Sequence, residues 1–463
     1  MKPRTSWTLW IVLTAAACIG PCVVAQQPAG GPPTPEQELQ MNIGVLNKLR
    51  ADPQAKPSIL ARRKEVLARR GVADPDTRLA GIGKIFDEAM AMPATDFEKN
   101  QQQLAKRIIA LMQPTAAVAP SANPPKAIPF IDVHAHLIGV GMMTPQGMTP
   151  SAKAAVELMD KTSTRVMIVM PPPGNGHPHA ESDIVYERAL AAAVRHYPTR
   201  FLFLAGGGSF ETLPNMPVTA EMRRRFEQRA EEILRSGARG FGELALLHTP
   251  FYESVPGDHP LMLLLSDIAA RHDAVLDIHM EVVTEETPLT ASQLAGYEAQ
   301  KDWGWLNAGR PRTLTPNVPG FERLLDHNPK TKIILEHLGN DFNTQWTAAL
   351  SRHLLEKHPN LYMSLRLLSP GRAPENNPLA FNGTIRPEWI KLFQDFPTRF
   401  LLGLDRFIAP SDARGNGPGL QLAQSVIRPE FTLMTQRFLN ALPPDLARKI
   451  ACENAMVIYK LAN

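Results

Sequence analysis

Cysteine is scarce in this sequence, with three residues among 463. Two of them, Cys18 and Cys22, lie in an N-terminal segment with the features of a signal peptide, so its removal would leave only Cys452. A single thiol excludes an intramolecular disulfide and argues against a cysteine cage for a metal ion. Stability must then come from the core and any bound metal. Cys452 lies in an apolar helical pattern, which indicates packing.

The sequence also lacks a large excess of either charge. Its 49 Lys and Arg residues nearly balance 45 Asp and Glu residues, for a formal net charge of +4. This balance gives no reason to expect a nucleic-acid partner. We expect a small-molecule substrate instead. The sequence leaves the oligomeric state open, and a homo-oligomer is one of the alternatives.

The N-terminus predicts a signal peptide over residues 1–25. Lys2 and Arg4 precede an apolar run from Trp7 to Ala25, and small residues at its end fit cleavage before Gln26. We therefore expect an exported protein, periplasmic or secreted, with no transmembrane segment in the mature chain.

Two alternatives remain for this segment. The run is long enough for an uncleaved membrane anchor, although Gly20 and Pro21 interrupt it. Cys18 or Cys22 could carry a lipid, although the triplets before them make poor lipoprotein signals.

Residues 26–127 predict a small all-helical region between proline-rich linkers. Proline, with 43 residues in all, clusters before Glu36 and again between Pro114 and Pro129. From Glu36 to about Met112, apolar residues recur every three or four positions, as amphipathic helices require. This region carries no histidine or paired acidic motif, so we assign it no chemistry.

Residues 128–463 predict an α/β fold, a (β/α)8 TIM barrel. Eight short apolar runs alternate with helical patterns, as in successive βαβ units. The runs are Ile128–Leu137, Arg165–Met170, Phe201–Ala205, Gly240–Leu247, Ala274–His279, Lys332–His337, Leu361–Leu365 and Phe400–Asp405. The helical patterns include Ser151–Lys161, Ser182–His196, Ala220–Ser236 and Pro260–His272.

Ionisable residues recur near the ends of these runs. They are His134, His136, Glu243, His279, His337 and Asp405. Residues two apart on a strand point to the same side, and the carboxyl ends of barrel strands converge on one cavity. Histidines and carboxylates together suit a divalent transition metal, most often zinc, which activates a water molecule. We expect Asp405 to bind the ion and accept a proton from that water.

Each of these residues also has an ordinary structural explanation. A His-X-His pair is common, and a lone histidine at a strand end is usually a satisfied structural residue. The prediction depends on the joint pattern, because ionisable side chains within apolar strands are costly unless they are paired or bound to metal.

From about Phe130 to Asn463 the chain resembles the amidohydrolase superfamily, in its amidohydrolase-related (amidohydrolase 2) branch. The resemblance is carried by four features, which are the segment Phe130-Ile131-Asp132-Val133-His134-Ala135-His136, the strand-end His279 and His337, the segment Gly403-Leu404-Asp405, and Glu453-Asn454-Ala455 near the C-terminus. No single motif is specific, but their order is.

This resemblance implies a barrel that binds one or two divalent ions. It assigns His134, His136 and Asp405 to one ion and His279 and His337 to a second. In one-metal members the fifth-strand histidine joins the first ion, and the sixth-strand histidine, here His337, contacts substrate or the attacking water.

Glu243 bears on the number of ions. Many two-metal relatives use a carbamylated lysine on the fourth strand and TatD-like hydrolases use a glutamate, and this strand has no lysine. We favour a bridging carboxylate at Glu243. The alternative is a pair with Arg239, or orientation of a ligand without binding the ion.

Several further residues are candidates for supporting roles. Arg366 could hold a substrate carboxylate or phosphate, or form a salt bridge. Two histidines in the loop after the second strand, His177 and His179, could contact substrate or lie in solvent. Two tryptophans in a long insertion, Trp303 and Trp305, could contact substrate or pack in the core. Three carboxylates could orient the histidines, namely Asp277, Glu281 and Glu336.

We predict a metal-dependent hydrolase that cleaves an amide, ester, lactone or phosphoester bond. One alternative is a non-oxidative decarboxylase or hydratase of a small acid, which uses one ion and no bridging carboxylate. Another is a non-catalytic envelope protein that binds metal.

Overall fold

The computed structural model describes most of the chain outside its N-terminal segment and several loops. The described residues are 35–69, 75–112, 125–138, 145–172, 180–210, 218–248, 253–289, 294, 312–338, 345–367, 377–380, 384–410, 413 and 429–461. The predicted signal peptide lies outside them. No helix among these residues is long and apolar enough to cross a membrane.

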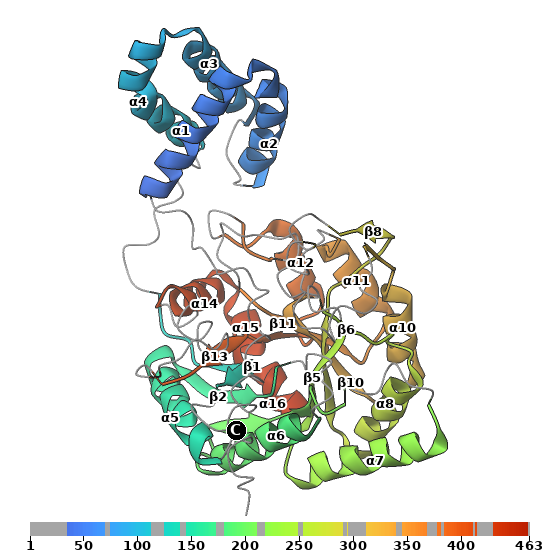
Figure 1. Ribbon diagram of the computed structural model, residues 1–463. Coiled ribbons are helices and arrows are strands. Elements are labelled where there is room, and N and C mark those ends of the chain that lie inside the picture. The colour runs from blue at the N-terminus through green and yellow to red at the C-terminus, as the bar shows by residue number, and fades with distance from the viewer. Residues whose placement is uncertain are drawn as a thin grey trace, which may run out of the picture.

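The N-terminal region is helical, as the sequence predicts. Its helices are α1 (Pro35–Ala51), the short η1 (Pro53–Ala55), α2 (Lys56–Arg69), α3 (Pro75–Ala91) and α4 (Ala94–Met112). They share a hydrophobic core of their own, in which Leu46, Phe86 and Ile108 are fully buried. Figure 1 shows these helices as one group beside the strand-containing part of the chain.

Eight parallel strand positions form the predicted barrel, two of them in two pieces (Figure 1). They are β1 (Phe130–Leu137), β2 (Thr164–Val169), β3 (Phe201–Phe203) with β4 (Ala205–Gly206), β5 (Gly240–His248), β7 (Val275–Met280), β10 (Lys332–Leu335), β11 (Leu361–Leu365) and β12 (Phe400–Leu402) with β13 (Arg406–Ile408). Each pairs with the next, and β13 returns to pair with β1. The sheet is therefore closed.

Helices and short strands complete the fold. The helices are α5 (Pro145–Thr162), α6 (Ala180–Arg195), α7 (Ala220–Arg235), α8 (Pro260–His272), α10 (Val318–His327), η2 (Glu336–Leu338), α11 (Ala348–Lys357), α12 (Pro387–Asp395), α14 (Pro429–Ala441), α15 (Pro444–Arg448), η4 (Lys449–Glu453) and α16 (Asn454–Tyr459). The short strands are β6 (Glu253–Ser254), β8 (Thr287–Pro288) and β9 (Thr313–Leu314).

The barrel interior is filled with apolar side chains that alternate along the strands. Ile131 and Val133 of β1 and Ile334 of β10 pack there together with Ile458 of α16. Because α16 contributes to this core, the C-terminal helix closes one end of the barrel. Asn454 at its start donates hydrogen bonds to the carbonyl oxygens of Pro397 (3.0 Å) and Phe400 (2.9 Å), which fixes the helix to the beginning of the eighth strand.

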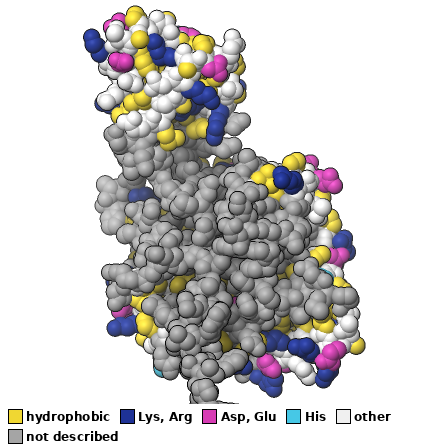
Figure 2. Space-filling model, viewed as in Figure 1, with side chains coloured by type: hydrophobic (Ala, Val, Ile, Leu, Met, Phe, Trp, Pro, Cys, Tyr) yellow, Lys and Arg dark blue, Asp and Glu magenta, His cyan; other side chains and the backbone are white. Residues whose placement is uncertain are grey.

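Surface charge is mixed, in keeping with the small net charge. On the face shown in Figure 2, basic and acidic side chains intermingle on the N-terminal helices. The amphipathic α7 likewise carries both signs, for example in the ion pair of Arg224 with Glu221 at 2.6 Å.

Cys452 packs as the sequence indicates. It is a free thiol that contacts the hydrophobic cores of the barrel, and its Sγ lies 3.2 Å from the carbonyl oxygen of Pro129. Burial raises the pKa of this thiol, which lowers its reactivity.

Candidate metal centre

The first strand contributes two histidines, and the Nδ1 atom of each already has a partner within the protein. His136 Nδ1 donates to the carbonyl oxygen of Met170 at 2.9 Å, and His134 Nδ1 contacts the carboxylate of Glu336. Each imidazole is thereby fixed with Nε2 facing its neighbour, and the two Nε2 atoms lie 2.9 Å apart. Both side chains are fully buried. An N–H held by a carbonyl or carboxylate is the usual way to orient a metal-binding histidine.

Glu243 of β5 divides its two oxygens between two pairs of histidines. Its Oε2 lies 3.4 Å from His134 Nε2 and 3.5 Å from His136 Nε2. Its Oε1 lies 2.7 Å from His279 Nδ1 and 3.8 Å from His337 Nε2. Among the described residues, the carboxylate of Glu243 thus pairs with these histidines and not with Arg239.

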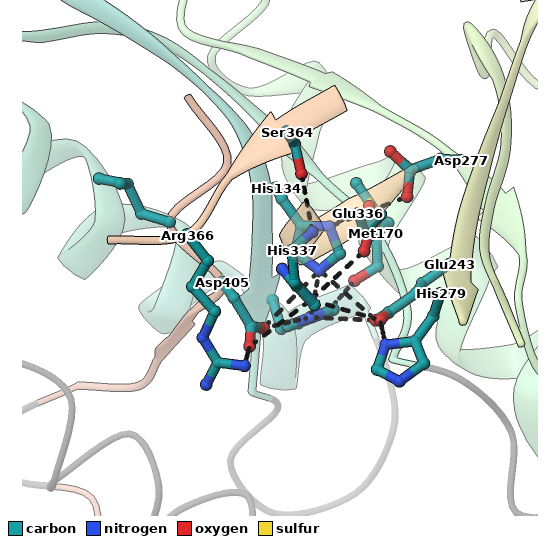
Figure 3. Close-up of polar contacts among 12 residues, drawn as sticks. His134, Met170, Glu243, Asp277, His279, Glu336, His337, Ser364, Arg366 and Asp405 are labelled. Carbon is teal, nitrogen blue, oxygen red and sulfur yellow. Dashed lines mark hydrogen bonds and ion pairs between the residues drawn. The ribbon is translucent and has the colours of Figure 1, made fainter. Parts of the chain in front are cut away.

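Asp405 divides its oxygens in a similar way. Its Oδ1 lies 3.2 Å from His136 Nε2 and 3.7 Å from His134 Nε2, whereas Oδ2 lies 3.8 Å from His337 Nε2. The guanidinium of Arg366 also reaches Oδ2, at 3.0 Å. Figure 3 shows Arg366 approaching Asp405 from the side opposite Glu243 and His279.

Two of these residues adopt a conformation that the sequence did not predict. His337 does not end a strand but lies in the η2 turn after β10, with φ 51°, and Asp405 has φ 50° between β12 and β13. The expected runs to His337 and Asp405 are therefore corrected to strands that end at Leu335 and Leu402. Left-handed backbone is costly for residues with a side chain and clusters at functional sites.

Local hydrogen bonds hold both turns. The His337 amide donates to Ser364 Oγ at 3.2 Å, and the Asp405 amide donates to the carbonyl oxygen of His134 at 3.0 Å. Asp132 adds to this arrangement, because its Oδ1 accepts from the amides of Leu404 (2.9 Å) and His134 (3.3 Å). The fully buried Asp132 thus joins the first strand to the turn that carries Asp405. In the sequence, the only indication of this role is the position of Asp132 two residues before His134.

The electrostatics of the cluster favour a bound cation. Burial alone would lower the pKa of His134, but the nearby carboxylates, Glu243 first, outweigh it and raise that pKa to about 9. Burial likewise opposes ionisation of Glu243, yet its contacts with His134, His279 and His337 hold its pKa well below the usual range. A field that attracts a proton to His134 attracts a metal ion to the same lone pair.

The donor set fits a divalent metal ion. Two overlapping groups have ligand atoms within 4.8 Å of one another, His134 with His136 and Asp405, and His134 with Glu243, Glu336 and His337. Nitrogen and carboxylate oxygen atoms are the ligands that zinc and similar ions prefer when no thiolate is present. A buried cluster of this kind, without a cation, would leave several carboxylates poorly compensated.

The three carboxylates expected to orient histidines behave differently. Glu336 contacts His134 as predicted. Glu281 lies 3.6 Å from His279 Nε2. Asp277 lies 3.8 Å from His134 Nδ1, and neither of its buried oxygens has a hydrogen-bond partner. Burial raises the pKa of Asp277 well above its usual value, so this side chain favours the neutral form.

The remaining substrate candidates are only partly described. Arg366 follows β11 and forms the ion pair with Asp405, the salt bridge that the sequence left open as one alternative. His177, His179, Trp303 and Trp305 lie outside the described residues.

A glycine turn after the third strand packs against Glu243 and was missed in the sequence. A Cβ at Gly207 would collide with the carbonyl oxygen of Glu243, so the close approach requires glycine. The buried Glu187 of α6 holds this turn by accepting from the Gly206 amide (2.8 Å) and Ser209 Oγ (2.9 Å), and it pairs with Arg229. In the sequence, the run Gly206-Gly207-Gly208 is the feature that could have predicted this turn.

Asp183, next to this turn, gives a pH-dependent prediction. Burial, with the nearby charge of Glu187, raises its pKa to about 7, against about 3.9 in an unfolded chain. Between these values the folded protein keeps a proton that the unfolded chain releases, so this residue's contribution to stability falls as pH rises from about 4 to about 7. Asp183→Asn should therefore raise the Tm by about 3 °C at pH 8 and change it little at pH 4.5, by calorimetry. An equal shift at both pH values would contradict the assignment.

Taken together, the barrel and its buried histidines and carboxylates define the class of metal-dependent barrel enzymes. The chain belongs to the Amidohydrolase family, whose model matches residues 131–461, well over half of the chain. Membership supports a metal-dependent enzyme and leaves the reaction unspecified.

Several solved structures resemble the chain at low identity. A 4-oxalomesaconate hydratase from Rhodopseudomonas palustris is 13% identical, with a TM-score of 0.41, 72% of this chain covered and 96% of that one. A 2,6-dihydroxybenzoate decarboxylase from Rhizobium is 15% identical, with a TM-score of 0.39 and coverage of 72% and 99%. Amidohydrolase 2 from Bifidobacterium longum subsp. infantis is 14% identical, with a TM-score of 0.38 and coverage of 72% and 100%. These likenesses say nothing about this chain's reaction, and no curated protein compared with the chain matches it.

Proposed function

We propose that this protein is a hydrolase that uses two divalent metal ions, zinc in the first instance, to cleave an amide, ester, lactone or phosphoester bond of a small substrate. The observation that carries the proposal is the position of Glu243, whose two oxygens face different pairs of histidines. A carboxylate in this position suits a bridge between two cations and offsets their repulsion. One ion would lie among His134, His136 and Asp405, and the other between His279 and His337.

Divalent ions in such a centre supply Lewis-acid activation of a water molecule and of the scissile group. The chain's own residues then direct the protons. Burial would raise the pKa of Asp405, but the positive charge of Arg366 and the hydrogen bond from His136 outweigh it and hold that pKa well below its usual range, so this carboxylate is ionised and can accept a proton. For an amide, an oxygen–carbon bond forms as the carbon–nitrogen bond breaks, and Asp405 passes the proton from the attacking water to the leaving nitrogen.

His337 has a separate part in this proposal. Burial lowers its pKa to about 3, so the ring is neutral at physiological pH and Nε2 can act as a ligand or accept a hydrogen bond. Its left-handed backbone aims the ring at Glu243 and Asp405. In a site with one ion, the same ring would contact substrate or the attacking water instead.

We also propose that residues 1–25 act as a signal peptide and that the mature chain is exported, with 26–127 as a helical region and 128–463 as the catalytic barrel. Support for export comes from Lys2 and Arg4 ahead of the apolar run to Ala25.

Metal removal tests the proposed activity. The purified protein is assayed against a panel of small amides, esters, lactones and phosphoesters, before and after treatment with a chelator. We expect turnover of at least one class, a loss of about 100-fold or more on chelation, and recovery when zinc or another divalent ion is restored. Turnover that survives complete removal of the metal would contradict the proposal.

A further inference from the structure

We propose that Arg366 binds a carboxylate of the substrate, so that the enzyme acts on small acids whose carboxylate lies a few bonds from the scissile group. This inference rests on the proposed function, because it names the substrate class of the same site. The supporting observations are the position of Arg366, its exposure, and those of its N–H donors that have no partner among the described residues.

Arg366 lies immediately beside the predicted reaction centre. It follows β11, at the same end of the barrel as the clustered histidines, and its Nη1 contacts Oδ2 of Asp405. The other oxygen of Asp405 faces His136. Only one carboxylate therefore separates the guanidinium from the first proposed metal position, and a group that Arg366 binds must be close to the reacting bond.

Exposure sets Arg366 apart from the rest of the cluster. Its side chain is 19% exposed, whereas those of Asp405, Glu243 and His337 are at most 4% exposed. Arg366 thus lies where the buried centre opens towards solvent, which is where a substrate must enter.

One edge of the guanidinium has no partner among the residues that the structure describes. Within the described part of the chain, the only contact of Arg366 with a charged or hydrogen-bonding group is the one with Asp405 through Nη1. Figure 3 shows the other nitrogens pointing away from Asp405. The side chain as a whole is 19% exposed, so it is not sealed from solvent. A planar pair of N–H donors matches a carboxylate in bidentate geometry.

The neighbouring charges favour a carboxylate over a phosphate. Two other described cations do not compete for this role, because Arg229 pairs with Glu187, and Arg406 is buried with its Nε 3.7 Å from Asp132 Oδ2. Arg366 carries a single positive charge, which Asp405 already shares, so a carboxylate adds less uncompensated negative charge at this position than a phosphate dianion.

Binding of simple anions tests this inference without any turnover. Malonate, acetate and inorganic phosphate are titrated into the zinc-loaded full-length protein by calorimetry. Malonate can place one carboxylate in the metal centre and the other on Arg366, whereas acetate can do only the former. We expect malonate to bind the wild type about 10- to 100-fold more tightly than acetate, the range of a charge-assisted hydrogen bond, and Arg366→Met to abolish that preference.

Variants and matched substrates complete the test. Arg366→Lys should restore part of the preference, because it keeps the charge without the fork, and Arg352→Met, which removes a surface ion pair with Asp395, should change nothing. Once a substrate is known, Arg366→Met should reduce kcat/KM for the acid about 10- to 100-fold more than for the analogue with a methyl group in place of the carboxylate.

Three results would overturn the inference. They are equal binding of malonate and acetate by the wild type, an unchanged preference in Arg366→Met, and tighter Arg366-dependent binding of phosphate than of malonate. An equal loss of turnover for both matched substrates would show that Arg366 acts only through Asp405. If malonate discriminates as expected but the protein hydrolyses nothing, the proposed reaction fails and the anion site stands.

Discussion

Replacement of His134 by alanine should reduce turnover at least about 1,000-fold while the barrel stays folded. His134 stands at the centre of the cluster, since its Nε2 lies within 3.7 Å of His136, Glu243 and Asp405. Its loss removes a ligand common to both candidate metal groups. Initial rates on any active substrate measure the effect, and circular dichroism establishes the fold.

Controls separate chemistry from stability in this experiment. The buried His134 leaves a cavity when it is shortened, so Asp405→Asn, which keeps volume and shape, serves as a second variant and should lose activity to a similar extent. His272→Ala, which removes an exposed histidine paired with Glu231, should retain full activity. Substantial turnover in a folded Asp405→Asn protein would refute the role proposed for that carboxylate.

Replacement of Glu243 by glutamine should remove one of two bound ions. The amide cannot supply a negative oxygen to each pair of histidines, so the position between His279 and His337 should lose affinity by about 100-fold or more. We expect the metal content to fall from about two ions to about one per chain, with a parallel fall in kcat/KM.

A matched control exists on the surface. Glu227→Gln, which breaks an exposed ion pair with Arg271, should leave both metal content and activity unchanged. If the wild type holds one ion and Glu243→Gln holds the same, then no bridge exists, and the one-ion decarboxylase or hydratase becomes the better hypothesis.

Periodicity in the sequence was sufficient to predict the barrel and to place several of the clustered histidines and carboxylates on its strands. Strands β1, β5 and β7 match their predicted runs. Because side chains alternate along a strand, these runs also determine to which side of the sheet His134, Glu243 and His279 point. Four named helical patterns also correspond to observed helices, and Pro260–His272 matches to the residue.

What the sequence could not reveal depends on contacts between distant segments. The turn at His337 depends on Ser364, and the one at Asp405 depends on a hydrogen bond to His134. Local propensity disfavours left-handed backbone at either residue, so only the assembled fold accounts for it. Similarly, the role of Asp132 emerges only when the eighth strand lies against the first.

The most direct test of the whole account is the metal content of the purified wild-type protein, measured by mass spectrometry with His134→Ala as the reference. The account predicts close to two firmly bound divalent ions per wild-type chain and fewer than about half an ion in the variant. A folded wild-type protein that binds no divalent ion after incubation with zinc, or one whose metal content is the same in His134→Ala, would contradict it.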